Sequence, residues 1–194
     1  MMSDESKHEV RKAILAKRRA LSVEQRQQAE EALVNHISQL PQIGGTMCAY
    51  VPVGSEPGSP AMLDVLVDRG ARVLLPVTTP EAPLSWGEYR AGQLVPAAFG
   101  LQEPVGRRLP PEAIAEAGVV LVPALAVDRT GVRLGRGAGF YDRSLPLAAP
   151  DIMLVAVIYD DELLPQLPAE PHDVPMTHAL APGSGLVRLA TRRE

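Results

Sequence analysis

The chain has 194 residues, 46% of them hydrophobic and 22% charged, a composition typical of a globular protein with a sizeable core. Its formal net charge of −4 argues against a general nucleic-acid binder, so any anion site must be local. No apolar run approaches the ~20 residues that span a bilayer, and the polar start lacks the apolar centre of a signal peptide. We therefore expect a cytoplasmic protein with one domain over residues 1–194 and no nucleic-acid or membrane partner. The single cysteine, Cys48, excludes an internal disulfide and lies in an apolar run that favours burial.

Two helices are predicted at the start of the chain. The first covers residues 7–21 and places Lys7 and Arg11, four residues apart, on one face. Taken alone, this pair is typical of a solvated face rather than of a binding site. Ser22 and Gln25 have the spacing of a capping box and predict the start of the second helix.

A βαβ unit follows. The apolar run 47–51 predicts a strand, Ser59 and Pro60 predict the N-cap and first turn of a helix, and residues 72–77 predict a second, parallel strand. The loop after the first strand carries Glu56. Because such loops at the carboxyl ends of parallel strands bind ligands, Glu56 is either a substrate contact or an exposed loop acid.

The region 76–111 is rich in Pro and Gly and is hard to assign. Short strands are predicted at 84–89 and 93–95, and a turn at 100–103. Trp86 either packs in the core, the commoner use of tryptophan, or stacks on a bicyclic ligand.

The last third of the chain continues the alternation of helices and strands. Residues 112–117 predict a short helix, and 119–122 predict a fully buried strand that leads into a glycine-rich loop. A helix is predicted at 141–147, and further strands at 153–159 and 186–190. The pattern is that of an α/β fold with a mostly parallel sheet.

The glycine-rich loop, Arg133 to Asp142, reads R-L-G-R-G-A-G-F-Y-D. Its glycines can turn successive backbone N–H groups towards one anion, and guanidinium groups suit phosphate oxygens. A helix beginning just after the loop would add the favourable end of its dipole. The sequence therefore predicts a site for a polyphosphate and its metal, with these candidate ligands: Arg133, Gly135, Arg136, Gly137 and Gly139.

Other phosphate loops are excluded by the pattern. No G-x-x-x-x-G-K-[S/T] motif occurs, and Asp142 stands where a dinucleotide fingerprint has its third glycine. The alternative to a phosphate site is a tight strand-to-helix turn with salt-bridged surface arginines. The flanking arginines and the closing aspartate favour phosphate.

A magnesium site is predicted from two carboxylates. Asp142 and Asp173 would suffice, because Mg²⁺ commonly takes one or two protein carboxylates and fills the remaining positions with water and phosphate oxygens. The spacing alone does not show that these side chains meet. Zinc is disfavoured because Cys48 stands alone and the four histidines lack ligand spacing. His172 is more typical of a loop histidine than of a catalytic base.

Together these segments resemble the 5-formyltetrahydrofolate cyclo-ligase family, also called methenyltetrahydrofolate synthetases. The resemblance covers nearly the whole chain in the right order and is most specific in the glycine-rich loop. The matching pieces are Lys7-x-x-x-Arg11, Tyr50-Val51-Pro52 with Glu56, Gly100 to Pro104, Val122 to Asp128, Gly131 to Asp142, and His172-Asp173.

The resemblance implies a three-layer α/β sandwich, a mostly parallel central sheet flanked by helices. It also implies an ATP- and Mg²⁺-dependent closure of 5-formyltetrahydrofolate to 5,10-methenyltetrahydrofolate, with release of ADP and phosphate; we expect a monomer. The implied ATP ligands are Lys7, Arg11, Arg133, Leu134, Gly135, Arg136, Gly137, Ala138, Gly139, Phe140 and Tyr141. The implied substrate ligands are Val51, Glu56, Arg136, Gly137, Gly139 and Phe140. The implied metal ligands are Asp142 and Asp173, and the implied catalytic residues are Lys7, Arg133 and Arg136.

The sequence departs from the family pattern at three places. Ala138 stands where glycine or lysine is frequent, Phe140 where tyrosine is usual, and residues 57–59 where the family has acidic or β-branched residues. Two other functions therefore remain open: a non-catalytic relative that binds folate or nucleotide, and an enzyme acting on a sugar phosphate or CoA.

Overall fold

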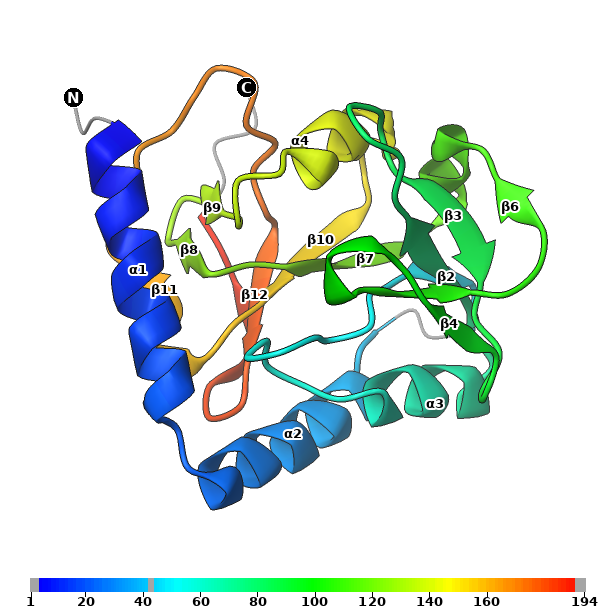
Figure 1. The fold of residues 1–194 in the computed structure, drawn as a ribbon, viewed down its shortest axis with the longest axis horizontal. Coiled ribbons are helices and arrows are strands. Elements are labelled where there is room, and N and C mark those ends of the chain that lie inside the picture. Colours follow the sequence, from blue (N-terminus) through cyan, green and yellow to red (C-terminus); the bar gives the residue numbers. More distant parts are fainter. Residues whose placement is uncertain (1–3, 42–43, 191–194) are drawn as a thin grey trace.

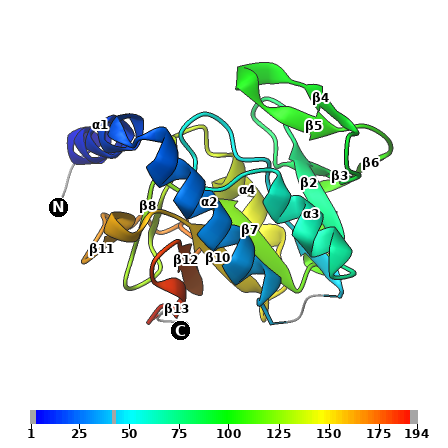
Figure 2. The ribbon, with the colours of Figure 1, turned by 90° about the horizontal axis from the view of Figure 1, so that it is seen from below.

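The computed structural model describes residues 4–41 and 44–190, which form a central sheet flanked by helices (Figures 1 and 2). The predicted α/β class is confirmed. The strand order in the eight-stranded sheet is β13-β12-β10-β7-β1-β2-β3-β6. The contacts among β12, β10, β7, β1 and β2 are parallel, whereas β13, β3 and β6 pair antiparallel at the two edges. The sheet is thus mostly parallel.

The elements have the following bounds. The helices are α1 (Asp4–Ala20), α2 (Val23–Ser38), α3 (Ala61–Asp68) and α4 (Phe140–Ser144), and the 3₁₀ turns are η1 (Ala98–Gly100), η2 (Pro111–Glu116), η3 (Leu145–Leu147) and η4 (Asp160–Glu162). The main-sheet strands are β1 (Thr46–Cys48), β2 (Arg72–Val77), β3 (Ser85–Glu88), β6 (Arg108–Leu109), β7 (Val119–Pro123), β10 (Met153–Val157), β12 (His178–Ala181) and β13 (Gly185–Arg188). Two small sheets contain β4 (Leu94–Pro96) with β5 (Gln102–Pro104), and β8 (Ala126–Asp128) with β9 (Arg133–Leu134) and β11 (Leu163–Leu164).

The central strands are largely apolar because both faces of the sheet are covered. In β1, Met47 packs into one hydrophobic cluster and Cys48 into the other, and the same alternation holds along β2, β7 and β10. Side chains of α2 and α3, including Leu33 and Leu66, cover the first face. The second face is covered by η2, α4 and η3, with Ile114 fully buried. The sheet and its two covers make the three layers.

Helix α1 stands apart from these layers, along one side of the molecule (Figure 1). Its Ile14 packs against Leu125, Leu134 and Leu167, which belong to the small sheet β11-β8-β9 and its surroundings. In this sheet, β8 precedes the glycine-rich loop in the chain and β9 forms the loop's first two residues. The packing therefore sets the first helix against the predicted phosphate site.

Most of the predicted elements are present, with shifted ends. The capping box of Ser22 and Gln25 is confirmed, and so is the burial of Cys48 and Trp86, both fully inside the core. The Ser59 cap is wrong: Pro60 occupies the cap position of α3, and no side chain caps that helix. The chain through 57–59 instead turns at Gly58, whose φ of +100° and contact with Met62 leave no room for a Cβ atom.

Three other predicted elements need correction. The turn predicted at 100–103 lies at 98–100, and Gln102 begins β5. The helix predicted at 141–147 is divided between α4 and η3, since Pro146 interrupts the helical hydrogen bonds. The helix predicted at 112–117 is a 3₁₀ turn at Pro111–Glu116. Within the described ranges, no helix is both long and apolar enough to cross a bilayer.

Candidate active site at the carboxyl ends of the central strands

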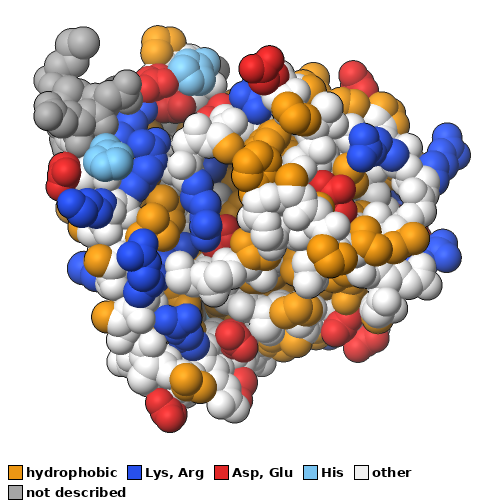
Figure 3. Space-filling view, in the orientation of Figure 1, with side chains coloured by type: hydrophobic (Ala, Val, Ile, Leu, Met, Phe, Trp, Pro, Cys, Tyr) orange, Lys and Arg blue, Asp and Glu red, His pale blue; other side chains and the backbone are white. Residues whose placement is uncertain are grey.

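A cavity of about 300 Å³ opens where the adjacent parallel strands β1, β2 and β7 end. Open parallel sheets bind ligands at this edge. Figure 3 shows basic side chains gathered over and beside α1, next to hydrophobic side chains at the centre of the face. The lining combines residues that follow β1 (Tyr50, Val51, Val53, Glu56), the end of β7 (Pro123, Ala124, Leu125) and the glycine-rich loop (Arg133, Gly135 to Asp142). The lining thus includes all the predicted substrate residues and, except for Leu134, the predicted ATP residues of the loop. Outside it lie Lys7, Arg11 and the predicted metal ligand Asp173.

The glycine-rich loop begins with β9 and ends in the first turn of α4. Gly137 and Gly139 have φ values of +100° and +72°, in the left-handed region that favours glycine. Among the hydrogen bonds of the described residues, none is donated by the backbone N–H groups of residues 136–139. Free N–H groups on a turn of this kind can bind an anion. Gly139 is also the cap of α4, although this helix has only five residues.

The arginines of the loop already have carboxylate partners. Arg133 lies 2.6 Å from Asp142 (Nη2 to Oδ1) and stacks on the ring of Tyr141 at 5.7 Å. Arg136 lies 3.3 Å from Glu56 (Nε to Oε1), with its side chain about half exposed. The loop is therefore tied to the segment after β1, and the arginines are close to the cavity rather than directed away from it.

Helix α1 contacts the loop, as the resemblance implied. The side chain of Arg11 donates a 3.0 Å hydrogen bond from Nε to the carbonyl oxygen of Gly135. One turn earlier, Lys7 lies 2.6 Å from Glu170 (Nζ to Oε1) and only 14% of its side chain is exposed. The two cations are thus part of this site's border rather than of a solvated face.

Glu56 is held close to its own loop. Its Oε2 accepts a hydrogen bond from the backbone N–H of Val53 at 3.0 Å, and 11% of its side chain is exposed. Burial raises the pKa of Glu56, while that N–H group and the charges of Arg136 and Arg18 act in the opposite direction. A buried carboxylate in a cleft is a candidate ligand for substrate N–H groups.

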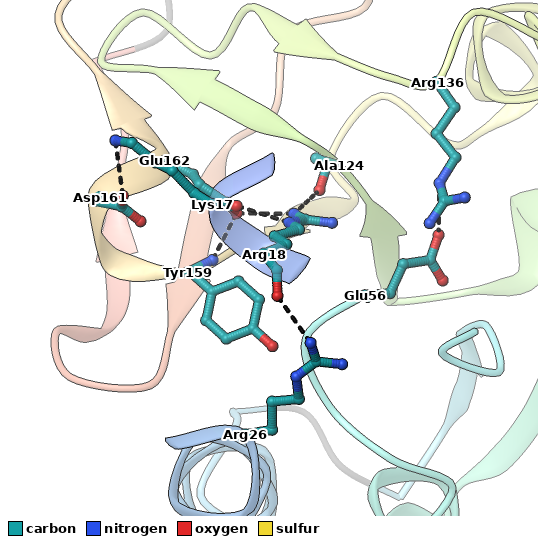
Figure 4. A network of polar contacts seen from close by, with 9 residues as sticks. All are labelled: Lys17, Arg18, Arg26, Glu56, Ala124, Arg136, Tyr159, Asp161 and Glu162. Atoms are coloured by element: carbon teal, nitrogen blue, oxygen red, sulfur yellow. Dashed lines mark hydrogen bonds and ion pairs between the residues drawn. The ribbon is translucent and has the colours of Figure 1, made fainter. Parts of the chain in front are cut away.

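The wall of the cavity opposite Arg136 contains a buried ion pair, Arg18 with Glu162 (Figure 4). Arg18 donates from Nε and Nη2 to the two carboxylate oxygens at 2.7 and 2.8 Å, and from Nη2 to the carbonyl of Ala124 at 2.7 Å. Burial opposes the charge of Arg18, yet its hydrogen bond and attraction to Glu162 raise its pKa. Glu162 also accepts from the N–H of Tyr159, so the pair joins α1 to η4.

The two predicted metal ligands have different partners. Asp142 pairs with Arg133, whereas Asp173 accepts a hydrogen bond from the N–H of Glu170. Among the described residues, ligand atoms of Glu170, His172 and Asp173 lie within 4.8 Å of one another. The structure therefore brings Asp173 to the end of α1 near Lys7, and a shared metal site with Asp142 stays a prediction.

Several lining residues were not predicted from the sequence. Arg18 is the clearest of them, and the sequence contains a pattern that could have identified it. Successive spacings of four residues separate Val10, Ile14 and Arg18, so this arginine lies on the apolar face of α1. Phe99 is a second such residue. It lies in η1 with φ +60°, is 82% exposed and borders the cavity. An exposed aromatic in a Pro- and Gly-rich region gave no periodic pattern to recognise.

Known proteins with this sequence pattern share one family. The profile of the 5-formyltetrahydrofolate cyclo-ligase family matches residues 3–182. This chain belongs to that family. A 5-formyltetrahydrofolate cyclo-ligase of Mycolicibacterium smegmatis is 57% identical over 193 residues, covering 97% of this chain and 100% of the relative. The cyclo-ligase of Escherichia coli K12 is 29% identical, covering 87% and 96%.

Solved structures of the cyclo-ligase family have the same fold. The NMR structure of the 5,10-methenyltetrahydrofolate synthetase of Aquifex aeolicus matches with a TM-score of 0.79 and 30% identity, covering 97% of this chain and 95% of that one. The synthetase of Mycoplasma pneumoniae matches with a TM-score of 0.70 at 20% identity, covering 88% and 94%, and supports the fold alone. The chain is thus an enzyme of the cyclo-ligase family in sequence and in architecture.

Proposed function

We propose that this protein catalyses the ATP- and Mg²⁺-dependent closure of 5-formyltetrahydrofolate to 5,10-methenyltetrahydrofolate, with release of ADP and phosphate. The observation that carries the proposal is the shared cavity. An apolar chamber with a buried glutamate adjoins a glycine loop that has free N–H groups and two arginines. A flat heterocycle and a polyphosphate could therefore be held next to each other. The family name supports 5-formyltetrahydrofolate as the heterocycle, and we assign the polyphosphate as ATP.

The residue types fit the chemistry of the proposed reaction. The oxygen of a formamide is a weak nucleophile and its carbon a weak electrophile. Transfer of the γ-phosphoryl group to that oxygen breaks the bond to ADP and gives an imidate-like phosphate. The second folate nitrogen then attacks the formyl carbon and loses its proton, and phosphate leaves with the former formyl oxygen.

Phosphoryl transfer needs positioning and charge neutralisation more than covalent help from the protein. Arg133, Arg136 and Lys7 are the cations we assign to the phosphates, and Arg11 holds the loop through its bond to Gly135. Val51, Glu56 and Phe140 are assigned to the folate. The remaining proposed phosphate contacts come from the backbone of residues 134–139 and from Tyr141.

The residues present also fit a magnesium ion. Asp142 is 40% exposed, follows the loop directly, and offers the carboxylate oxygen that Mg²⁺ prefers. We assign it as a metal ligand, with Asp173 as the second. The ion would neutralise phosphate charge during transfer. Arg133 would then pair with a phosphate oxygen instead of Asp142, and Asp142 would pair with the metal ion.

The proposal is tested by following the ultraviolet absorbance of the methenyl product with ATP and Mg²⁺ present. The wild type should form product, and Asp142→Ala should lower kcat/KM by about 100-fold or more. Asp161→Ala is the matched control, because Asp161 is also a partly exposed acid in an ion pair, with Lys17 at 3.1 Å. It should keep full activity.

Two outcomes would contradict the proposal. One is a folded wild type that binds ATP and folate but forms no product, which would indicate a non-catalytic member of the family. The other is full activity in Asp142→Ala.

A further inference from the structure

Three buried polar atoms have no hydrogen-bond partner among the described residues: Arg18 Nη1, the Tyr50 hydroxyl and the Tyr141 hydroxyl. All three residues line the same cavity. Unpaired buried polar groups destabilise a folded protein and are rare for that reason. Three of them around one chamber indicate that a bound molecule completes their hydrogen bonds.

These atoms come from three separate elements and are held in fixed positions. Arg18 lies on α1, is 2% exposed, and is fixed by Glu162 and by the carbonyl of Ala124. In Figure 4 its guanidinium extends from Glu162 towards the side on which Glu56 and Arg136 lie. Tyr50 follows β1 and is 4% exposed. Tyr141 lies in the first turn of α4 under the side chain of Arg133.

The chemistry of the three groups limits the ligand. A guanidinium donates hydrogen bonds and accepts none, so the partner of Arg18 Nη1 must be an acceptor. Burial raises the pKa of Tyr50 and of Tyr141, so both hydroxyls are protonated at neutral pH and can donate or accept. Glu56, in the same cavity, accepts. The complementary molecule has an acceptor for Arg18 with N–H donors beside it on the same edge.

We propose that Arg18, Tyr50 and Tyr141 bind the lactam edge of the folate's pteridine ring, with Arg18 donating to the ring carbonyl oxygen. This inference rests on the proposed function, which supplies the folate. The pteridine edge has the required pattern, a carbonyl oxygen next to a ring N–H and an amino group. Its flat apolar faces suit the apolar part of the lining, such as Leu84 and Pro123. Arg18 and Tyr50 are then binding and specificity-determining residues, and Tyr141 serves the folate rather than the nucleotide alone.

The first test is Tyr50→Phe, which removes only an unpaired hydroxyl. KM for 5-formyltetrahydrofolate should rise about tenfold while KM for ATP stays unchanged, since one hydrogen bond to substrate is lost. The melting temperature of the free protein should stay equal or rise. A change in KM for ATP without a change in KM for folate would overturn the inference.

Tyr89→Phe is the matched control. Its hydroxyl donates to Asp64 at 2.7 Å and lies outside the cavity. This variant should melt at a lower temperature and keep both KM values. Equal effects of Tyr50→Phe and Tyr89→Phe on folate binding would show that the hydroxyl in the cavity has no special role.

The second test probes the proposed contact between Arg18 and the carbonyl of the pteridine ring. Folate analogues with an amino group in place of the ring carbonyl present donors to Arg18, so the wild type should bind them about tenfold more weakly than the matching carbonyl compounds. Arg18→Lys keeps the charge beside Glu162 but lacks the second guanidinium nitrogen, and should lose most of this discrimination. Unchanged discrimination would overturn the assignment of Arg18. If Arg18→Lys does not fold, the double variant Tyr50→Phe/Tyr141→Phe takes its place and should bind the carbonyl compounds at least tenfold more weakly than the wild type. Unchanged affinity would overturn the assignment of the two tyrosines.

The failure of this inference differs from the failure of the proposed function. If the wild type forms product but Tyr50→Phe binds folate as tightly as the wild type, the inference is overturned and the proposed function stands. Absence of product overturns the function. Calorimetric binding of folate to the same variants then still decides whether the three residues form the ring's binding surface.

Discussion

At the scale of single residues, the free site contains a carboxylate whose burial is unfavourable for its charged form. Glu56 is a carboxylate in a cavity with mostly apolar walls, and its burial outweighs the help that it gains from Val53 and Arg136. A substrate N–H group would complete its hydrogen bonds. Binding groups of this kind reduce the stability of the free protein, which is a common cost of function.

The raised pKa of Glu56 gives a pH-dependent prediction. The folded chain binds this proton more tightly than the unfolded chain, so the resulting stability is present at low pH and is lost as the pH rises through the folded pKa. Glu56→Gln stays neutral. It should melt with the wild type below pH ~4, near the ordinary glutamate pKa, and a few degrees above it at neutral pH. Melting curves of both proteins across this range measure the difference, and a less stable Gln variant at neutral pH would contradict the prediction.

At the scale of elements, several polar contacts join α1 to the rest of the molecule, and three of them are made by residues of the candidate site. Lys7 meets Glu170, Arg11 meets Gly135, and Arg18 meets Glu162. The contact made by Arg18 is the only one of the three in which both side chains are fully buried. It therefore has the greatest influence on how firmly the helix packs.

Removing one partner of this pair should be strongly destabilising. Glu162→Ala leaves the charge of Arg18 buried without compensation, and we expect a loss of about 3–5 kcal/mol in the free energy of unfolding. Urea denaturation gives the value. Glu116→Ala removes an exposed ion pair with Arg72 and should cost ~1 kcal/mol or less. Similar losses in the two variants would show that the burial of the Arg18 pair is energetically unimportant.

The predictable elements were those with a strong local pattern. The strands β1, β7 and β10 appear as apolar runs because both faces of the sheet are covered, and α2 is marked by its capping box. The strands β8, β9 and β11 have two or three residues each, too few for any periodicity, and their pairing depends on contacts distant in sequence. The glycine loop was predictable from residue types, whereas Arg18 and Phe99 became visible only once the cavity was assembled.

At the scale of the whole molecule, the cavity is built from segments that span most of the chain. Its lining runs from Arg18 on the first helix to Asp142 on the last. A ligand in this cavity touches several elements at once. Occupancy should therefore stabilise the fold as a whole rather than one local segment.

Ligand binding should raise the melting temperature. At a concentration of 100 times Kd, a ligand adds ~2.7 kcal/mol of stability, which corresponds to about 5–10 °C for a chain of this size. We expect shifts of this kind with ATP and Mg²⁺ and with 5-formyltetrahydrofolate. Mg²⁺ alone is the control and should give a much smaller shift. No shift with ATP and Mg²⁺ would contradict the nucleotide site.

The position of α1 also has a consequence for how the protein is made. Arg18 and Glu162 are 144 residues apart in the chain. At a synthesis rate of ~5–20 residues per second, the first helix leaves the ribosome roughly 7–30 s before its partner exists. During that interval its arginine lacks the carboxylate that balances its charge in the folded protein, although Leu125 and Leu134, which pack against its apolar stripe, are made earlier. The helix that borders the glycine loop is thus synthesised well before its ion-pair partner, so a nascent chain can fix Arg18 at the cavity only after Glu162 has been made.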